Sequence, residues 1–191
     1  IGMSVAFAVF LILMMQVTYE WGFDRFHKHA DCLYRLEITH EEWGGQACLN
    51  RPLIDAFVAS SPHIVKGALL NGFVDKQYVM VEHDGSRESF LETLYPVSAD
   101  YADVFELTIV EGERSALSVP GQVLISQSMA QKFFGSSSAL GQQLQGEGWT
   151  AVVGGVYKDL PENSIVQNAI YKKISDQEGA GAWGMNNFEC Y

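Results

Sequence analysis

The chain opens with an unbroken apolar run and becomes polar abruptly at Glu20. Residues 1–19 carry no charged side chain and consist mainly of aliphatic residues, Phe and Met. As a helix rising about 1.5 Å per residue, this run nearly spans a hydrocarbon core about 30 Å thick. It is longer than the apolar part of most signal peptides, and no small-x-small cleavage site precedes Glu20. The pattern therefore predicts a retained membrane helix over residues 1–19, as the C-terminal part of the first membrane span, with a buried core helix as the alternative.

Beyond Glu20, short segments with strand and helix patterns follow one another. Alternating or continuously apolar positions predict strands over residues 33–39, 77–82, 87–95, 122–125 and 149–157. Helices are predicted over 53–58 after Pro52, over 98–105 with Ser98 as cap, and over 127–134 between Ser126 and Gly135. Turns or loops are predicted at 43–45, 83–86, 111–112 and 159–164. Strands and helices mix without strict alternation, which favours an α+β fold.

Composition and charge limit the classes of partner. Residues 20–191 are enough for one domain or two small lobes. The formal net charge of −11 argues against nucleic acid as a partner and against docking of the chain on anionic lipid. The chain begins at Ile1 and ends at Tyr191 within a pattern, so we expect it to be C-terminally truncated.

The sequence contains no motif that predicts catalysis. There is no P-loop, no H-E-x-x-H and no G-x-S-x-G. His27 and His29 stand two residues apart with Lys28 between them, which suits capping or solvated surface better than a metal site. The acidic pairs, 41–42 and 100 with 103, are interpreted as solvated surface. Gly154-Gly155 in an apolar strand indicates close packing or a bulge. We therefore expect no enzyme activity and no catalytic, cofactor-binding or metal-binding residues.

The cysteines are few and widely spaced. Cys32, Cys48 and Cys190 form no C-x-x-C pair, so neither a disulfide scaffold nor a zinc knuckle is expected. Two interpretations stay open, namely three buried free thiols or one disulfide between Cys48 and Cys190.

Four stretches of the chain, in this order, resemble one family. They read YEWGFDRFHKHAD over residues 19–31, SADYADVF over 98–105, LISQSMAQKFFG over 124–135 and VVGGVYKDLPENS over 152–164. Together they are similar to MacB/FtsX-like ABC transporter permeases, most closely to the group common in Bacteroidetes-type bacteria. Trp21-Gly22 departs from the family, which more often has an aliphatic residue and a Ser, and His29 stands where Asn is common.

The resemblance implies a fold and a place in the cell. The fold would be a membrane helix followed by a two-lobed MacB-like periplasmic domain over residues 20–191. Residues 31–70 and 165–191 would form a porter-like lobe beside the membrane, and 72–163 an inserted, β-rich lobe. The protein would lie in the bacterial inner membrane, with residues 20–191 in the periplasm.

The resemblance also implies a function and partners. The chain would be a permease subunit that couples cytoplasmic ATP hydrolysis to handling of a lipoprotein, peptide or antibiotic. Its partners would be a cytoplasmic ABC ATPase, a second permease subunit and a periplasmic adaptor or lipoprotein, with no cofactor. Residues 20–31 would either pass on movement of the membrane helix or only anchor the chain at the membrane interface. A different class of function is a membrane-tethered sensory or ligand-binding domain of a signalling protein.

Overall fold

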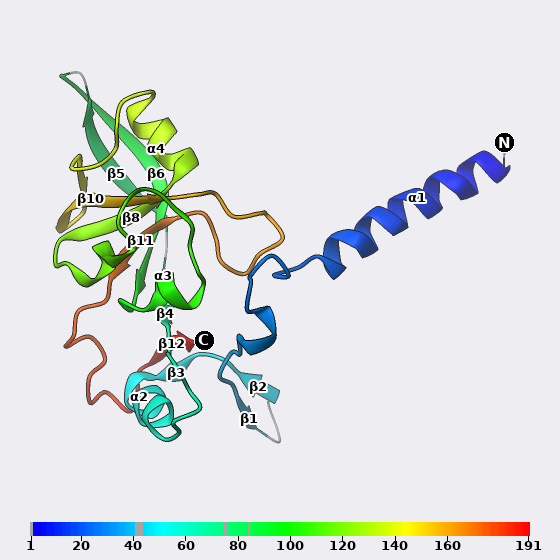
Figure 1. The fold of residues 1–191 in the computed structure, drawn as a ribbon, viewed down its shortest axis with the longest axis horizontal. Coiled ribbons are helices and arrows are strands. Elements are labelled where there is room, and N and C mark those ends of the chain that lie inside the picture. The colour runs from blue at the N-terminus through cyan, green and yellow to red at the C-terminus, as the bar shows by residue number, and fades with distance from the viewer. Residues whose placement is uncertain (1, 41–43, 75, 84) are drawn as a thin grey trace. The chain divides into compact units, whose positions relative to one another are not determined.

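The computed structural model describes residues 2–40, 44–74, 76–83 and 85–191 (Figure 1). The chain divides into two compact units. The first unit contains Ile1–Cys32 and Leu160–Gln167, and the second contains Leu33–Asp159 and Asn168–Tyr191. The second unit mixes strands with short helices, which confirms the α+β prediction.

The first unit consists mainly of helix α1, which runs from Gly2 to Trp21. None of its described residues is buried, and the helix is long and apolar enough to cross a membrane. Its 20 residues correspond to about 30 Å, the thickness of a hydrocarbon core. A short 3₁₀ helix, η1 (Ala30–Cys32), follows it.

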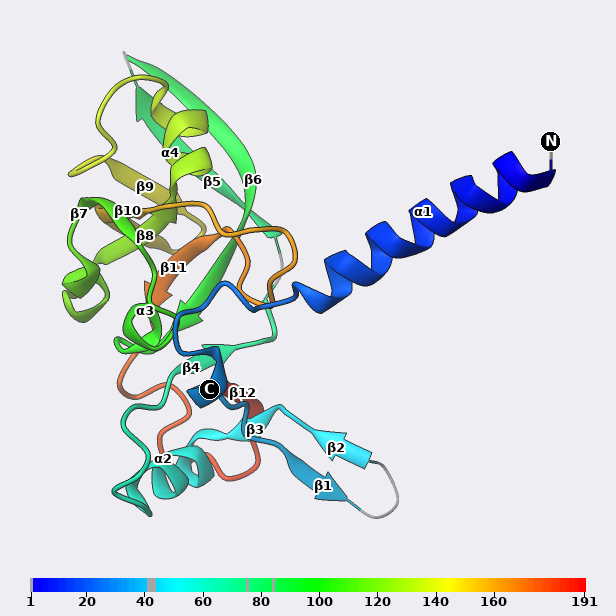
Figure 2. The same cartoon turned by 45° about the vertical axis from the view of Figure 1, so that its right-hand side comes forward.

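The second unit is organised by one large sheet with the strand order β11-β8-β10-β9-β5-β6-β4-β12-β3 (Figure 2). Strand β11 pairs with β8 on one side and with β6 on the other, so six strands close into a ring. The ring contains β5 (Lys76–His83), β6 (Ser86–Val97), β8 (Gln122–Ser126), β9 (Gln143–Gly146), β10 (Trp149–Tyr157) and β11 (Ile170–Lys173). The pairs β8–β10 and β6–β11 are parallel, and the other pairs of the ring are antiparallel.

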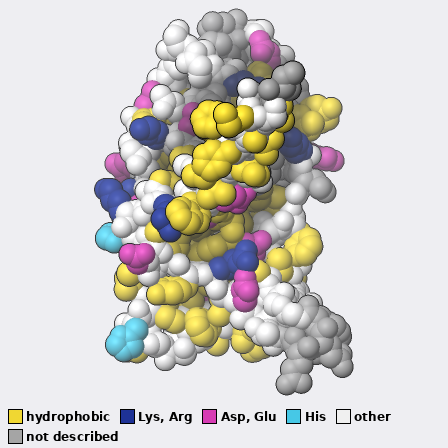
Figure 3. All heavy atoms as spheres, turned by 90° about the vertical axis from the view of Figure 1, so that its right-hand side faces the viewer, with side chains coloured by type: hydrophobic (Ala, Val, Ile, Leu, Met, Phe, Trp, Pro, Cys, Tyr) yellow, Lys and Arg dark blue, Asp and Glu magenta, His cyan; other side chains and the backbone are white. Residues whose placement is uncertain are grey.

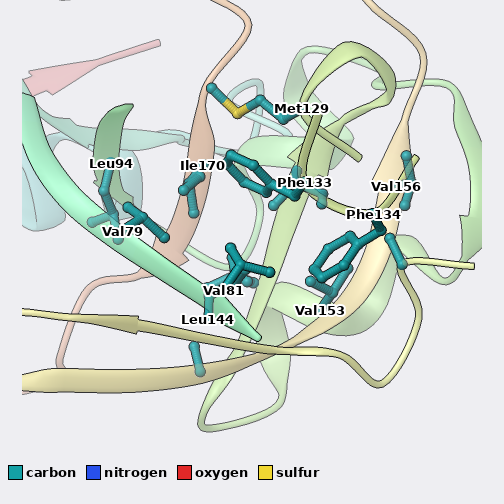
Figure 4. Packing of buried hydrophobic residues seen from close by; sticks show 14 residues of the cluster. Val79, Val81, Leu94, Met129, Phe133, Phe134, Leu144, Val153, Val156 and Ile170 are labelled. Carbon is teal, nitrogen blue, oxygen red and sulfur yellow. The ribbon is translucent and has the colours of Figure 1, made fainter. Parts of the chain in front are cut away.

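A hydrophobic core fills this ring and extends to helix α4 (Gln127–Phe134). Phe133 lies beside Ile170 and Phe134 beside Val153 (Figure 4). The helix begins as predicted, because the Ser126 hydroxyl accepts a hydrogen bond from the Met129 amide at 3.3 Å.

A second hydrophobic cluster lies where β3 (Leu49–Asn50), β4 (Leu69–Asn71), β12 (Asn186–Cys190) and α2 (Arg51–Ala59) meet. Its buried members are Leu49, Ile54, Ile174, Phe188 and Cys190. Helix α2 confirms the predicted helix after Pro52, and the Asn50 side chain caps it by accepting from the Leu53 amide at 3.0 Å. The predicted lobe boundaries, 31–70 with 165–191 and 72–163, stay a prediction.

Two predicted local structures near the start of the second unit are wrong. A strand is expected over 33–39, but the structure has only β1 (Ile38–His40) there. The preceding residues do not pair with a neighbouring strand, because the Leu36 amide donates to the Cys190 carbonyl at 2.8 Å. The loop expected over 43–45 contains β2 (Gly44–Gln46), which pairs with β1, while residue 43 lies outside the described ranges.

The helix expected over 98–105 is shorter and begins differently. Helix α3 spans Tyr101–Val104, and Asp100 is the residue that precedes it. The Ser98 hydroxyl instead accepts a hydrogen bond from the Leu69 amide, at the start of strand β4, at 3.0 Å. It therefore does not cap the helix.

The turn expected at 111–112 is the end of strand β7 (Ile109–Gly112), which pairs with β10. Gly112 has a φ of +75°, and a Cβ there would lie 2.4 Å from the Gly154 carbonyl oxygen. The register of β10 against β8 shifts between Val153 and Gly155, which confirms the predicted bulge or close approach at Gly154-Gly155. A 3₁₀ helix, η2 (Arg114–Ser118), follows β7.

The cysteines match neither prediction. All three are free thiols, but Cys32 is exposed, Cys48 is half-buried and only Cys190 is buried. Leu49 pairs with Phe188, and side chains alternate between the two faces of a strand. Cys190, two residues after Phe188, therefore shares its face and is buried with it, whereas Cys48 lies before the start of β3 and is half-buried. Burial raises the pKa of the Cys190 thiol from 9.0 to about 11.

Candidate functional site

The first unit joins the end of helix α1 to a distant part of the chain. Helix α1 ends at Trp21, and the amide of the next residue, Gly22, donates to the carbonyls of Thr18 and Tyr19 at 3.1 and 3.2 Å. A Cβ at position 22 would lie 3.0 Å from Nδ2, the side-chain amide nitrogen of Asn163. The lack of a side chain at Gly22 therefore lets Asn163 come close to the helix end, where its Nδ2 donates to the Tyr19 carbonyl at 3.4 Å.

Asp24 makes the main connection. Its carboxylate oxygen Oδ1 accepts from the Ser164 hydroxyl at 2.9 Å and from the Ile165 amide at 3.0 Å. Its own amide donates to the Asn163 carbonyl at 3.0 Å. We call this arrangement of Asp24 with Asn163, Ser164 and Ile165 the Asp24 clamp. In Figures 1 and 2 the orange segment accordingly lies beside the blue chain that leaves α1.

The backbone at Asp24 is unusual, since its φ is +54°. Asp and Asn enter this left-handed region more readily than other non-glycine residues. The conformation turns the chain so that both the amide and the carboxylate of Asp24 meet the same segment. An acidic residue at this position thus supplies both a turn and an acceptor.

His27 belongs to the same site. It is 8% exposed, its ring centroid lies 4.2 Å from that of Phe26, and its Nε2 lies 3.9 Å from the Asp24 carboxylate oxygen. The histidine thus packs beside the clamp. His29 is exposed, so the two histidines predicted as capping or surface residues have different environments.

The segment held by Asp24 is part of the β10–β11 connection, residues 158–169. The two ends of this connection are fixed within the second unit. The Tyr157 hydroxyl donates to the Ala169 carbonyl and accepts from the Ala169 amide, both at 2.8 Å. The Asp159 carboxylate accepts from the Ser128 amide and hydroxyl at 3.0 and 2.9 Å, at the start of α4. A negative charge is favourable there because a helix N-terminus carries partial positive charge.

The tyrosines around these anchors are buried and packed together. The pKa values of Tyr101, Tyr157 and Tyr171 are raised well above the usual value of 10, and burial is the largest cause in each case. Their hydroxyls therefore stay protonated and act through hydrogen bonds. The rings pack together, with centroids 5.0 Å apart for Tyr101–Tyr171 and 5.4 Å for Tyr157–Tyr171.

The other candidate residues are surface features. The Lys66 ammonium forms ion pairs with the carboxylates of Asp103 and Asp100, at N–O distances of 2.6 and 3.0 Å. The Arg114 guanidinium lies 3.5 Å from the Asp103 carboxylate. The Lys66 hydrogen bond lowers the pKa of Asp103. Glu41 and Glu42 lie outside the described residues. Within the described ranges, no group of three His, Cys, Asp or Glu side chains could hold a metal ion.

The sequence indicates one half of this site. The stretch 20–31 stands out by its position and its aromatic and charged residues, and it contains Asp24. For the partner segment the sequence predicts only a turn at 159–164. Its Asn163-Ser164 pair was the available signal, because side chains of this kind bind backbone and carboxylate groups in turns.

Comparisons with known proteins agree with this architecture. A family model described as the MacB-like periplasmic core domain matches residues 1–177. A solved domain of a candidate permease protein from Porphyromonas gingivalis is similar with a TM-score of 0.65 and 21% identity, over 76% of this chain and 62% of that one. The chain thus spans less than two thirds of that domain.

A second solved structure is the periplasmic region of MacB from Actinobacillus actinomycetemcomitans. It is similar with a TM-score of 0.52 and 16% identity, over 75% of this chain and 78% of that one. At these identities the likeness shows the fold alone. No curated protein matches the chain.

Proposed function

This chain belongs to the MacB-like periplasmic core domain family, and on that premise we propose that it is a permease subunit of an ABC-type export or mechanotransmission complex. Helix α1 crosses the bacterial inner membrane, and residues 20–191 lie in the periplasm. A cytoplasmic ABC ATPase and a second permease subunit complete the complex. A lipoprotein, peptide or antibiotic is the cargo, with a periplasmic adaptor or lipoprotein as a further partner. We assign no catalytic step to this chain.

The Asp24 clamp is the observation that carries the proposed mechanism. A helix that shifts in the membrane moves its last turn, and Gly22 and Asp24 follow that turn directly. Asp24 is bonded to Ser164 and Ile165, so the displacement reaches the β10–β11 connection. A simple surface anchor would not require bonds to this segment, and the clamp therefore favours coupling.

From the β10–β11 connection, the displacement has two routes into the second unit. One route is the Tyr157–Ala169 hydrogen-bond pair, which holds the ends of β10 and β11. The other is Asp159, which is bonded to Ser128 in the first turn of α4. Both routes end on elements that line the ring core, so a small movement acts on packed strands and a helix.

Co-purification of the full-length membrane protein in mild detergent tests the assignment. We expect a stoichiometric P-loop ATPase to co-purify, with ATP hydrolysis that is lost when the two proteins are separated. Recovery of the protein alone, or with its own cytoplasmic kinase or cyclase, would contradict the permease assignment and support the tethered sensor instead.

A further inference from the structure

The clamp also fixes the depth of the β10–β11 connection if α1 spans the bilayer, as proposed above. Asp24 follows Trp21, the last residue of α1, by three positions. Fully extended, three residues cover at most about 10 Å. The chain is not extended, because the Phe23 amide donates to Glu20 at 3.1 Å and the Arg25 amide to Gly22 at 3.3 Å. Asp24 thus lies within a few ångströms of the helix end.

This depth corresponds to the lipid headgroup region. The apolar run of α1 ends where Glu20 and Trp21 begin the polar part of the chain, and headgroups add about 5–8 Å on each side of the hydrocarbon core. The Ile165 amide is 3.0 Å from the Asp24 carboxylate, so position 165 is held at the same depth.

The side chains at this depth are apolar and exposed. Trp21 is 73% exposed, Phe23 43%, Phe26 37% and Ile165 39%. Aromatic side chains are favoured at the membrane–water interface, where the ring meets acyl chains and the edge meets headgroups. They follow directly on the exposed apolar side chains of α1. Hydrophobic side chains, drawn in yellow, gather on the surface that Figure 3 shows, and basic ones are scattered there.

The local charge permits contact with lipid even though the whole chain is acidic. Between residues 20 and 32, Glu20, Asp24 and Asp31 outnumber Arg25 and Lys28 by one, and in the β10–β11 connection Asp159 and Glu162 outnumber Lys158 by one. The net charge of −11 therefore comes mainly from other parts of the chain. Segments with so small a net charge are repelled only weakly by anionic headgroups, and their binding depends little on lipid charge.

We propose that the β10–β11 connection is a membrane-contact segment whose Ile165 side chain lies among phospholipid headgroups, beside Trp21, Phe23 and Phe26. The occupant of this surface is the bilayer itself, because the surface is continuous with a helix that ends in it. The clamp then does more than join two parts of the chain. It holds a segment of the periplasmic domain on the membrane, where the segment responds to movement of both the helix and the lipid surface.

Lipid contact at position 165 can be measured directly. The full-length protein would carry a fluorinated phenylalanine at position 165, 21 or 119, one at a time, in nanodiscs. Broadening of its ¹⁹F signal would be recorded with a nitroxide lipid labelled near the headgroup, and separately with a water-soluble gadolinium chelate. Val119 controls for chance contact between an exposed apolar side chain and the lipid label, because it is 42% exposed and Ile165 is 39% exposed.

We expect the lipid nitroxide to broaden the signals at 165 and 21 to a similar extent, and several-fold more than the signal at 119. In Asp24→Ala the effect at 165 should fall while the effect at 21 persists. A label at 165 that responds only to the aqueous chelate, while the label at 21 responds to lipid, would overturn the proposal. If position 21 also fails to respond to lipid, α1 does not span the bilayer, and the failure is that of the proposed function.

Discussion

Asp24→Asn should loosen the connection between helix α1 and the β10–β11 connection without unfolding either. The carboxylate accepts two hydrogen bonds, from the Ser164 hydroxyl and the Ile165 amide. Asn keeps an acceptor oxygen and tolerates the φ of +54°, so the substitution mainly removes the charge. Bonds to charged groups contribute about 1.5–3 kcal/mol and neutral bonds about 0.5–1.5 kcal/mol. The two bonds together should therefore weaken by about 2 kcal/mol, or about 30-fold in the opening equilibrium.

The Ile165 amide reports this opening because it donates directly to Asp24. We expect hydrogen–deuterium exchange at Ile165 to become about 30-fold faster in the variant, measured in nanodiscs. Exchange at Met129, which donates to Ser126 in another part of the chain, should not change.

Glu162→Gln is the matched control, because Glu162 is an exposed acidic residue in the same segment and loses the same charge. It should leave exchange at Ile165 unchanged. Equal exchange in the two variants would refute the clamp, since the effect would then reflect charge alone or no bond at all.

Three further predictions follow from the fold. Gly112→Ala should destabilise the protein by about 3 kcal/mol in denaturant unfolding, whereas Gly148→Ala, at a similar φ but in open space, should lose only about 1 kcal/mol. Equal losses would exclude the close approach to Gly154. Because the folded-state pKa of Cys190 is about 11 and its usual value is 9.0, the unfolded chain loses this proton first. The contribution of the Cys190 thiol to the free energy of unfolding is fully present below pH 9. It declines between pH 9 and pH 11, by at most about 1.4 kcal/mol per pH unit. Cys190→Ala should remove that part of the slope, and an identical pH profile would contradict the burial. In the native protein a thiol reagent should modify Cys32 first and Cys190 only on unfolding, and rapid reaction of Cys190 would refute this order.

Local patterns predict those elements whose deciding residues lie close together in the sequence. Ser126 with Gly135 and Pro52 with its apolar face specify α4 and α2 through caps and periodicity, and both helices exist. The apolar run over 149–157 predicts a strand, and β10 occupies these residues. In each case the residues that decide the structure lie within one turn or one strand of each other.

The errors occurred where distant residues decide the structure. The segment 33–37 has an alternating pattern but bonds to Cys190 rather than to a neighbouring strand. Gly112 ends a strand because the opposing Gly154-Gly155 leaves room for it, which no local pattern around 111–112 reveals. The partner of Asp24 lies 140 residues away at Ser164, so the sequence indicated a coupling or anchoring segment and not the bond that distinguishes them.

The central claim is that movement of α1 reaches the second unit through the Asp24 clamp. Two variants with the same flexible Gly-Ser insert test it, one between Gly22 and Phe23 and the other between Cys32 and Leu33. The first insert slackens the chain between the helix and Asp24 and leaves the long 3.4 Å bond from Asn163 to Tyr19 as the remaining link to the clamp. The second leaves the helix, the clamp and the β10–β11 connection joined, while slackening the direct chain between the units.

The measurement is the spin–spin distance between labels at position 119 of the two permease subunits, with the ATPase empty and trapped with ATP and vanadate. Hydrolysis in each variant shows that the complex has assembled. We predict that the nucleotide-dependent change in distance is lost with the insert after Gly22 and kept with the insert after Cys32. Equal behaviour of the two variants, whether both keep or both lose the change, would contradict the claim.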